Sequence, residues 1–91
     1  MEQWILDNYI INRDGSVYSK RTNKTLKQSL SKGSSGYYYV VGLWNGERVK
    51  TYRVNRLVAQ MFLPNPHNLP QVDHINRNRL DNRVENLEWV T

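Results

Sequence analysis

The chain has 91 residues, of which 38% are hydrophobic and 11% aromatic, a composition typical of one small folded domain rather than a disordered segment. It has no cysteine, which excludes disulfide bridges and cysteine-ligated zinc. No apolar run is long enough to span a bilayer, and the start MEQWILDNYI lacks the features of a signal peptide. We therefore expect no membrane partner and a cytoplasmic location. Thirteen Lys and Arg against eight Asp and Glu give a net charge of +5, which favours polyanionic partners without requiring them.

The first predicted elements are two short strands in NYIINRDGSVYSK, on either side of a turn at Arg13-Asp14-Gly15. The apolar members of this hairpin are Tyr9, Ile11, Val17 and Tyr18. The next segment, residues 21–35 (RTNKTLKQSLSKGSS), is polar, basic and rich in Ser and Gly. This composition predicts a mobile loop.

The segment GYYYVVGLWNGERVKTYRV predicts a second hairpin, because two β-rich runs flank Asn45-Gly46, the pair favoured in a type I′ turn. The following VNRLVAQMFL has the apolar spacing of a short helix, which Pro64 and Pro66 end. The residues that this spacing assigns to the core are Leu57, Val58, Met61 and Phe62. We expect one face of the helix to be buried.

The end of the chain predicts two short strands, in LPQVDHI and LEWVT, joined by the basic connection NRNRLDNRVEN with one helical turn from Asp81. Val72, Ile75 and Trp89 lie on or beside these strands, and we expect them in the core. Asn82 lies in the connection, where a turn or cap role is the ordinary interpretation. The fold class that follows is α+β, with small antiparallel hairpins and a short helix.

Asp73 and His74 stand together at the end of the first of these two strands. A carboxylate can hold a divalent cation, and an imidazole that titrates near neutrality can take a proton from an attacking water. Because successive side chains of a strand point to opposite faces, the strand must twist or end here for the two to converge. For an isolated pair, the simpler interpretation is that Asp73 caps a turn and His74 is a partly buried surface residue.

The phrases YRVNRLVAQMFLPNP and VDHINRNRLDNRVENLEWVT resemble the HNH endonucleases, specifically the phage and intron-encoded homing type. The resemblance implies a partial ββα-metal motif over residues 53–91, preceded by a strand-rich segment over residues 1–52. It also implies hydrolysis, by nicking, of a phosphodiester in double-stranded DNA with Mg²⁺ or Mn²⁺. The expected setting is the cytoplasm of a phage-infected or bacterial host cell.

Carried over residue by residue, the resemblance makes Asp73 the metal ligand and His74 the general base. Asn86 corresponds to the central asparagine, which in the family pins the loop beside the histidine through backbone hydrogen bonds. Arginines pair phosphate oxygens well, and they position a protein on DNA without reading its sequence. The arginines expected to contact the DNA are Arg53, Arg56, Arg77, Arg79 and Arg83.

The sequence departs from the family pattern at two places. Family members often have a histidine where this chain has Asn55, so the contribution of that imidazole is absent. The family pattern also continues into a helix that carries a second metal ligand, whereas this sequence ends at Thr91. We therefore expect slow or absent cleavage by the 91-residue chain.

Two alternatives stay open at this stage. The first is a catalytically impaired module of the same family that binds DNA or blocks a protein partner, such as a phage-encoded inhibitor. In the second, the strands alone bind DNA in a groove, and the Asp73-His74 pair is incidental. A reading frame that continued past Thr91 would favour the enzyme.

Overall fold

The computed structural model describes residues 1–34 and 36–91. Within these residues the chain forms two α-helices, one short 3₁₀ helix and eight strands, which are arranged in three antiparallel sheets with the orders β1-β2-β3, β4-β5-β6 and β7-β8. This arrangement confirms the α+β class. The elements are α1 (Gln3–Asn8), β1 (Tyr9–Ile11), β2 (Val17–Ser19), β3 (Lys24–Thr25), β4 (Ser29–Gly33), β5 (Gly36–Trp44), β6 (Val49–Arg53), α2 (Val54–Phe62), β7 (Gln71–His74), η1 (Val84–Asn86) and β8 (Leu87–Val90).

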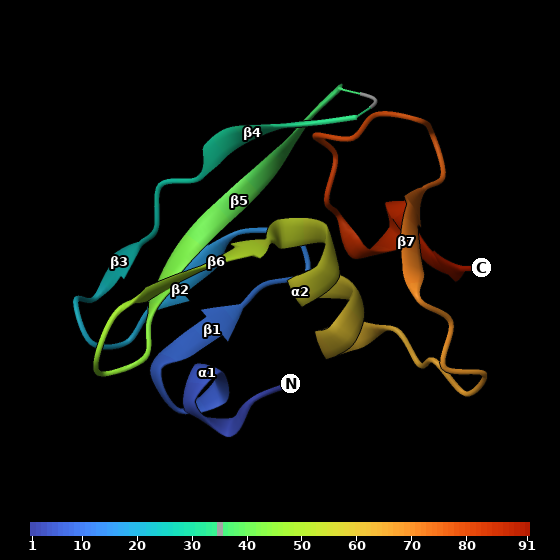
Figure 1. Cartoon of the computed structure of the whole chain (residues 1–91). Helices are drawn as coiled ribbons and strands as arrows, with labels where there is room; N and C mark the ends of the chain where they lie inside the picture. The colour runs from blue at the N-terminus through green and yellow to red at the C-terminus, as the bar shows by residue number, and fades with distance from the viewer. Residues whose placement is uncertain (35) are drawn as a thin grey trace.

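Helix α2 lies between the β5–β6 hairpin and the β7–β8 pair and contacts both (Figure 1). It begins at the residue directly after β6, so sheet and helix are joined without a connecting loop. Four of its residues are buried, namely Val54, Leu57, Val58 and Ala59. The helix therefore holds the β7–β8 pair against the rest of the molecule.

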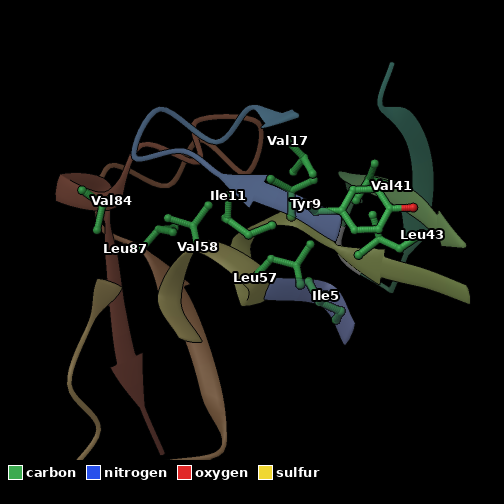
Figure 2. Packing of buried hydrophobic residues seen from close by; sticks show 11 residues of the cluster. Ile5, Tyr9, Ile11, Val17, Val41, Leu43, Leu57, Val58, Val84 and Leu87 are labelled. Carbon is green, nitrogen blue, oxygen red and sulfur yellow. The ribbon is translucent and has the colours of Figure 1, made fainter. Parts of the chain in front are cut away.

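The core is one row of apolar side chains (Figure 2). It runs from Val84 and Leu87, beside β8, through Val58 and Ile11 to the side chains on β5. Both parts of the chain contribute to it, so the predicted boundary between 1–52 and 53–91 divides the sequence by motif and not the core. The buried hydrophobic residues of this cluster are Ile5, Tyr9, Ile11, Val17, Val41, Leu43, Val54, Leu57, Val58, Val84 and Leu87.

Helix α2 ends as the proline pattern predicted, but its buried face differs from the prediction. Leu57 and Val58 are buried, and Phe62 packs partly buried against the core. Met61 is 44% exposed, so its assignment to the core was wrong. The buried stripe instead includes Val54 and Ala59, because the helix begins directly at the edge of sheet β4-β5-β6.

The two predicted hairpins are present. Tyr9, Ile11 and Val17 are buried as expected, and Tyr18 is half-buried. In the β5–β6 hairpin, the backbone N–H of Asn45 donates to the carbonyl of Arg48 at 3.1 Å, so the tip of the turn is Gly46-Glu47.

The turn between β5 and β6 is not the predicted type I′. Among the described residues, Gly46 has a positive φ of 100°, whereas Asn45 and Glu47 do not. A type I′ turn needs a positive φ at both central positions. Asn45 stands outside the two central positions, and its side-chain oxygen accepts hydrogen bonds from the backbone N–H groups of Glu47 and Arg48.

Two further segments differ from the sequence prediction. The loop expected over residues 21–35 contains β3 and β4, of which β4 pairs along β5 from Ser29 to Gly33, while Ser35 lies outside the described residues. Helix α1 was not predicted, because it is six residues long and buries only Ile5. Strand β4 and helix α1 depend on contacts with residues distant in sequence rather than on a local apolar pattern.

Candidate active site

The site is built on the last hairpin of the chain. Strands β7 and β8 pair antiparallel from Gln71 to His74, with His74 opposite Leu87. The pairing extends beyond the strands, because the backbone N–H of Ile75 donates to the carbonyl of Asn86 at 2.8 Å. His74 therefore stands where β7 ends and the connection to η1 begins, as the sequence required for Asp73 and His74 to approach one another.

Asn86 holds this connection in place. Its side-chain Nδ2 donates to Asn76 Oδ1 at 3.0 Å and to the Asp81 carbonyl at 2.9 Å. Its Oδ1 accepts from the backbone N–H of Asn76 at 3.0 Å. These are contacts of the kind that the resemblance implied for the central asparagine, and its part in catalysis stays a prediction.

The connection turns sharply after His74. The backbone N–H of Arg77 donates to the His74 carbonyl at 2.9 Å, and Arg77 has a positive φ of 67°. A side chain at positive φ is uncommon and persists where surrounding contacts impose it. This turn directs Arg77 and Arg79 to the same side of the molecule as the Asp73-His74 pair, because all four line one hollow.

Asn82 contacts His74 directly, which sequence reasoning missed. His74 Nε2 and Asn82 Oδ1 lie 2.8 Å apart, and the two residues are only 7% and 6% exposed. The prediction of an ordinary turn or cap role for Asn82 was wrong. No local pattern reveals the contact, because the burial of Asn82 depends on Gly15, on the first hairpin, which packs against it.

A hollow of about 620 Å³ opens in front of this pair. Asp73 is exposed on its wall, whereas His74 is buried, so the imidazole is shielded from water on most sides. The walls of the hollow are strongly polar and include three arginines. The residues that line it are Tyr38, Arg53, Asn55, Val72, Asp73, His74, Arg77 and Arg79.

Tyr38 reaches the hollow from β5. The Arg53 guanidinium lies 4.3 Å from the centre of the Tyr38 ring and donates to its hydroxyl at 3.1 Å. Hydrogen bonds from Ser31 and Arg53 hold the pKa of Tyr38 below its usual range. The pair places a cation and an aromatic ring together at the rim.

Three of the site residues predicted from the sequence do not line the hollow, namely Asn86, Arg56 and Arg83. Asn86 lies beneath the connection. Arg56 on α2 donates to the Pro70 carbonyl at 3.0 Å and lies 5.8 Å from the centre of the Trp89 ring. Ile75, expected in the core, is 54% exposed, because it lies beyond the end of β7.

Arg83 is the third of these residues, and its charge is engaged within the protein. Its guanidinium contacts Asp81 at 2.7 and 2.8 Å and Glu85 at 3.4 Å. Hydrogen bonds from Arg83 hold the pKa of Asp81 far below its usual range, and Asp81 raises that of Arg83. Arg77 and Arg79, in contrast, form no ion pair within the described part of the chain.

The oxygen donors of the hollow suit a hard divalent cation. Such ions prefer carboxylate, amide and water oxygens. Asp73 supplies an exposed carboxylate, and Asn55 Oδ1 is buried without a hydrogen-bond partner among residues 1–34 and 36–91. Over the same residues there is no cluster of three or more His, Cys, Asp or Glu that could hold a metal alone.

Comparison with known proteins agrees with this geometry. Residues 52–91 match the HNH endonuclease family. Over 93% of its length the chain is 40% identical to an uncharacterized HNH endonuclease of Acanthamoeba polyphaga mimivirus, of which it covers 25%. Residues 52–91 thus carry the HNH endonuclease motif, and the chain as a whole is similar to HNH endonucleases. The family resemblance read from the DHIN and NLEW phrases is thereby confirmed.

Two phage relatives match this chain over nearly its whole length. It is 38% identical to the DNA endonuclease I-HmuI of Bacillus phage SP01, covering 92% of this chain and 47% of the relative. It is also 38% identical to the H-N-H endonuclease F-TflII of Escherichia phage T5, covering 91% and 42%. This chain thus spans less than half the length of these relatives.

A solved structure shows the same fold. The structure of the HNH homing endonuclease I-HmuI, described for its DNA binding and cleavage, superimposes with a TM-score of 0.77 at 39% identity. The match covers 92% of this chain and 47% of that one. The shared fold therefore includes the strand-rich N-terminal part as well as the motif itself. None of the described helices is both long and apolar enough to cross a membrane.

Proposed function

We propose that this chain is the DNA-facing, catalytic part of a homing-type endonuclease that nicks double-stranded DNA with the help of a divalent cation. The observation that carries the proposal is the placement of His74 and Asp73 in one hollow with Arg53, Arg77 and Arg79. A general base, a carboxylate and phosphate-binding cations are the groups that phosphodiester hydrolysis needs. The match of residues 52–91 to the HNH endonuclease family and the fold shared with I-HmuI support the same reaction.

Each residue of the hollow has a definite part in this proposal. The imidazole of His74 takes a proton from the attacking water. Asp73 would hold Mg²⁺ or Mn²⁺, with the Asn55 oxygen as a second donor on the same wall. When bound, the cation offsets the charge that builds on the phosphate and on the leaving oxygen. Hydrolysis of this kind leaves a 5′-phosphate and a 3′-hydroxyl.

The arginines position the DNA. Arg77 and Arg79 have no acidic partner within the described residues, so their guanidinium groups are free to pair phosphate oxygens. Arg53 presents its charge beside the Tyr38 ring. Arg83 and Arg56 make protein contacts, so we assign them a smaller share of the DNA contact than Arg53, Arg77 and Arg79. We expect the reaction in the cytoplasm of a phage-infected or bacterial cell.

The test is nicking of supercoiled plasmid in Mg²⁺ or Mn²⁺. We expect slow nicking by the 91-residue chain and faster nicking by a chain extended with the helix that the resemblance implies. Loss of one group that stabilises the transition state commonly lowers the rate about a hundred- to a thousandfold. His74→Ala should lower the rate of the extended chain about 10²- to 10⁴-fold, the usual contribution of a general base.

A matched control is available because the chain has one further histidine. His67 is exposed and lies outside the hollow, so His67→Ala should leave nicking unchanged. Cleavage that survives both His74→Ala and Asp73→Ala would refute the assignment. DNA binding without nicking by the extended chain would instead favour the alternative of a binding module, whose partner is DNA or a protein.

A further inference from the structure

The contact between His74 and Asn82 links the expected base to a residue that no motif assigns. The Nε2 atom of the ring lies 2.8 Å from the amide oxygen of Asn82. Both residues are more than nine-tenths buried. In a site screened from water, such a contact decides which ring nitrogen carries the proton, because a mismatched pair would leave both groups unsatisfied.

An amide oxygen only accepts hydrogen bonds, so Nε2 must be the donor in this contact. In the neutral ring, Nδ1 then keeps the lone pair. No hydrogen bond to Nδ1 is formed within residues 1–34 and 36–91, and His74 lines the hollow that holds Asp73. We propose that Asn82 is a positioning residue that fixes the tautomer of His74, so that Nδ1 is the atom that accepts the proton of the attacking water. This inference rests on the function proposed above.

Asn82 is itself held by the turn of the first hairpin. Gly15 has a φ of 95°, and a Cβ at this position would lie 3.1 Å from Asn82 Cβ and 3.2 Å from the Asn82 carbonyl oxygen. The same turn is joined to η1 by a hydrogen bond of 2.8 Å from the Val84 N–H to the Arg13 carbonyl. The β1–β2 turn, distant in sequence, therefore sets the position of Asn82 and through it the ring of His74.

The first experiment uses NMR of the ¹⁵N-labelled 91-residue chain at a pH where both histidines are neutral. We expect His74 to carry its proton on Nε2 alone and to show a visible Nε2–H correlation, since a buried hydrogen bond slows exchange with water. The exposed ring of His67 provides the unconstrained reference in the same spectrum. A His74 ring protonated on Nδ1 would overturn the inference, because it would mean that Asn82 donates to Nε2 through its amide nitrogen.

Two substitutions at Asn82 separate hydrogen bonding from shape. Asn82→Leu has a similar shape but no acceptor, and we expect loss of the Nε2–H correlation and population of the second tautomer. Asn82→Asp retains an oxygen acceptor, and we expect the neutral ring to keep the wild-type tautomer. The inference fails if Asn82→Leu leaves the Nε2–H correlation and the tautomer unchanged. It also fails if the neutral ring in Asn82→Asp changes its tautomer. Should Asn82→Leu not fold, the tautomer of the wild-type ring still decides the matter.

A glycine pair tests the link to the first hairpin. Gly15 and Gly46 have similar φ values of 95° and 100°, but a Cβ at Gly46 would have nothing within 4 Å. Gly15→Ala and Gly46→Ala therefore introduce the same backbone strain, and only the first displaces Asn82. We expect Gly15→Ala to shift the ring ¹⁵N signals of His74 and Gly46→Ala to leave them in place. Equal effects would contradict the link.

None of these measurements depends on cleavage. If the His74 ring carries its proton on Nε2 but the extended protein does not nick DNA, the proposed function is refuted and the role of Asn82 in setting the tautomer is not. Nicking by a protein whose ring carries its proton on Nδ1 would refute the role of Asn82 alone.

Discussion

One amide group, that of Asn86, holds the connection between β7 and η1 at two points. Its nitrogen contacts Asn76 and the backbone of Asp81, and its oxygen receives the backbone N–H of Asn76. The residue is 6% exposed, so water cannot replace these bonds. Asn86 therefore shapes the segment that carries Arg77 and Arg79, although it does not reach the hollow itself.

We predict that Asn86→Ala lowers the free energy of unfolding by about 1–3 kcal/mol, the cost of leaving buried polar groups without partners. Asn78 on the same connection is exposed, and its side chain accepts one local hydrogen bond, from the Leu80 N–H. Asn78→Ala should change stability by no more than about 0.5 kcal/mol. Urea unfolding measures both, and equal losses would show that the Asn86 contacts do not hold the connection.

The pair formed by Asp81 and Arg83 gives the stability a dependence on pH. Hydrogen bonds from Arg83 place the pKa of Asp81 in the folded chain below its value in the unfolded chain. The unfolded state then binds the proton more readily, so this contribution is present above about pH 3.9, the ordinary aspartate value, and is lost as the pH falls further. Asp81→Asn should flatten the decrease in thermal midpoint at acid pH. An unchanged acid profile in this variant would contradict the shift.

At the scale of elements, α2 decides how the molecule is assembled. It follows β6 without a linker and contacts strands of all three sheets. Leu57 is 1% exposed on its inner side, whereas Met61, one turn further along, is 44% exposed. The two residues belong to the same apolar pattern in the sequence but to different surfaces in the fold.

Substitution of Leu57 and of Met61 compares the buried face of α2 with its exposed face. Leu57→Ala should cost about 2–5 kcal/mol in the free energy of unfolding, because it removes buried methyl groups and leaves a cavity. Met61→Ala should cost no more than about 0.5 kcal/mol, as surface substitutions usually do. Thermal or urea unfolding provides the comparison. A large loss in the free energy of unfolding for Met61→Ala would show that Met61 is part of the core.

Over the whole molecule, three of the 13 Lys and Arg residues line one hollow. Arg53 reaches it from the end of β6, and Arg77 and Arg79 reach it from the connection after β7. Segments far apart in the sequence thus present their charges together. The single core that they share with the N-terminal strands keeps this arrangement fixed.

We predict that affinity for duplex DNA falls steeply with salt, because each neutralised phosphate releases counterions and contributes about 0.9 to the slope of log K against log salt. Arg77→Ala and Arg79→Ala should each reduce this slope by about that amount, with little change in sequence preference. Arg83→Ala should reduce it less, because Asp81 already engages its guanidinium. Binding indifferent to salt would count against the DNA contacts.

Features that depend on neighbours along the chain could be predicted from the amino-acid sequence alone. The two hairpins follow from turn residues between β-rich runs, and α2 follows from its apolar spacing. The resemblance to HNH endonucleases follows from the DHIN and NLEW phrases. The position of the Asp73-His74 pair at the end of a strand follows from the same local pattern. Local propensity and side-chain periodicity are sufficient for such features.

Features that depend on contacts between residues distant in sequence became apparent only from the folded structure. Strand β4 forms because β5 offers backbone groups for pairing, although its only large apolar side chain, Leu30, is exposed. Asn82 is buried against His74 because Gly15 leaves room for it. Arg83 is engaged by Asp81, while Arg77 and Arg79 are left to face the hollow. Close packing and buried hydrogen bonding act across space, so residues alike in sequence acquire different parts in the site.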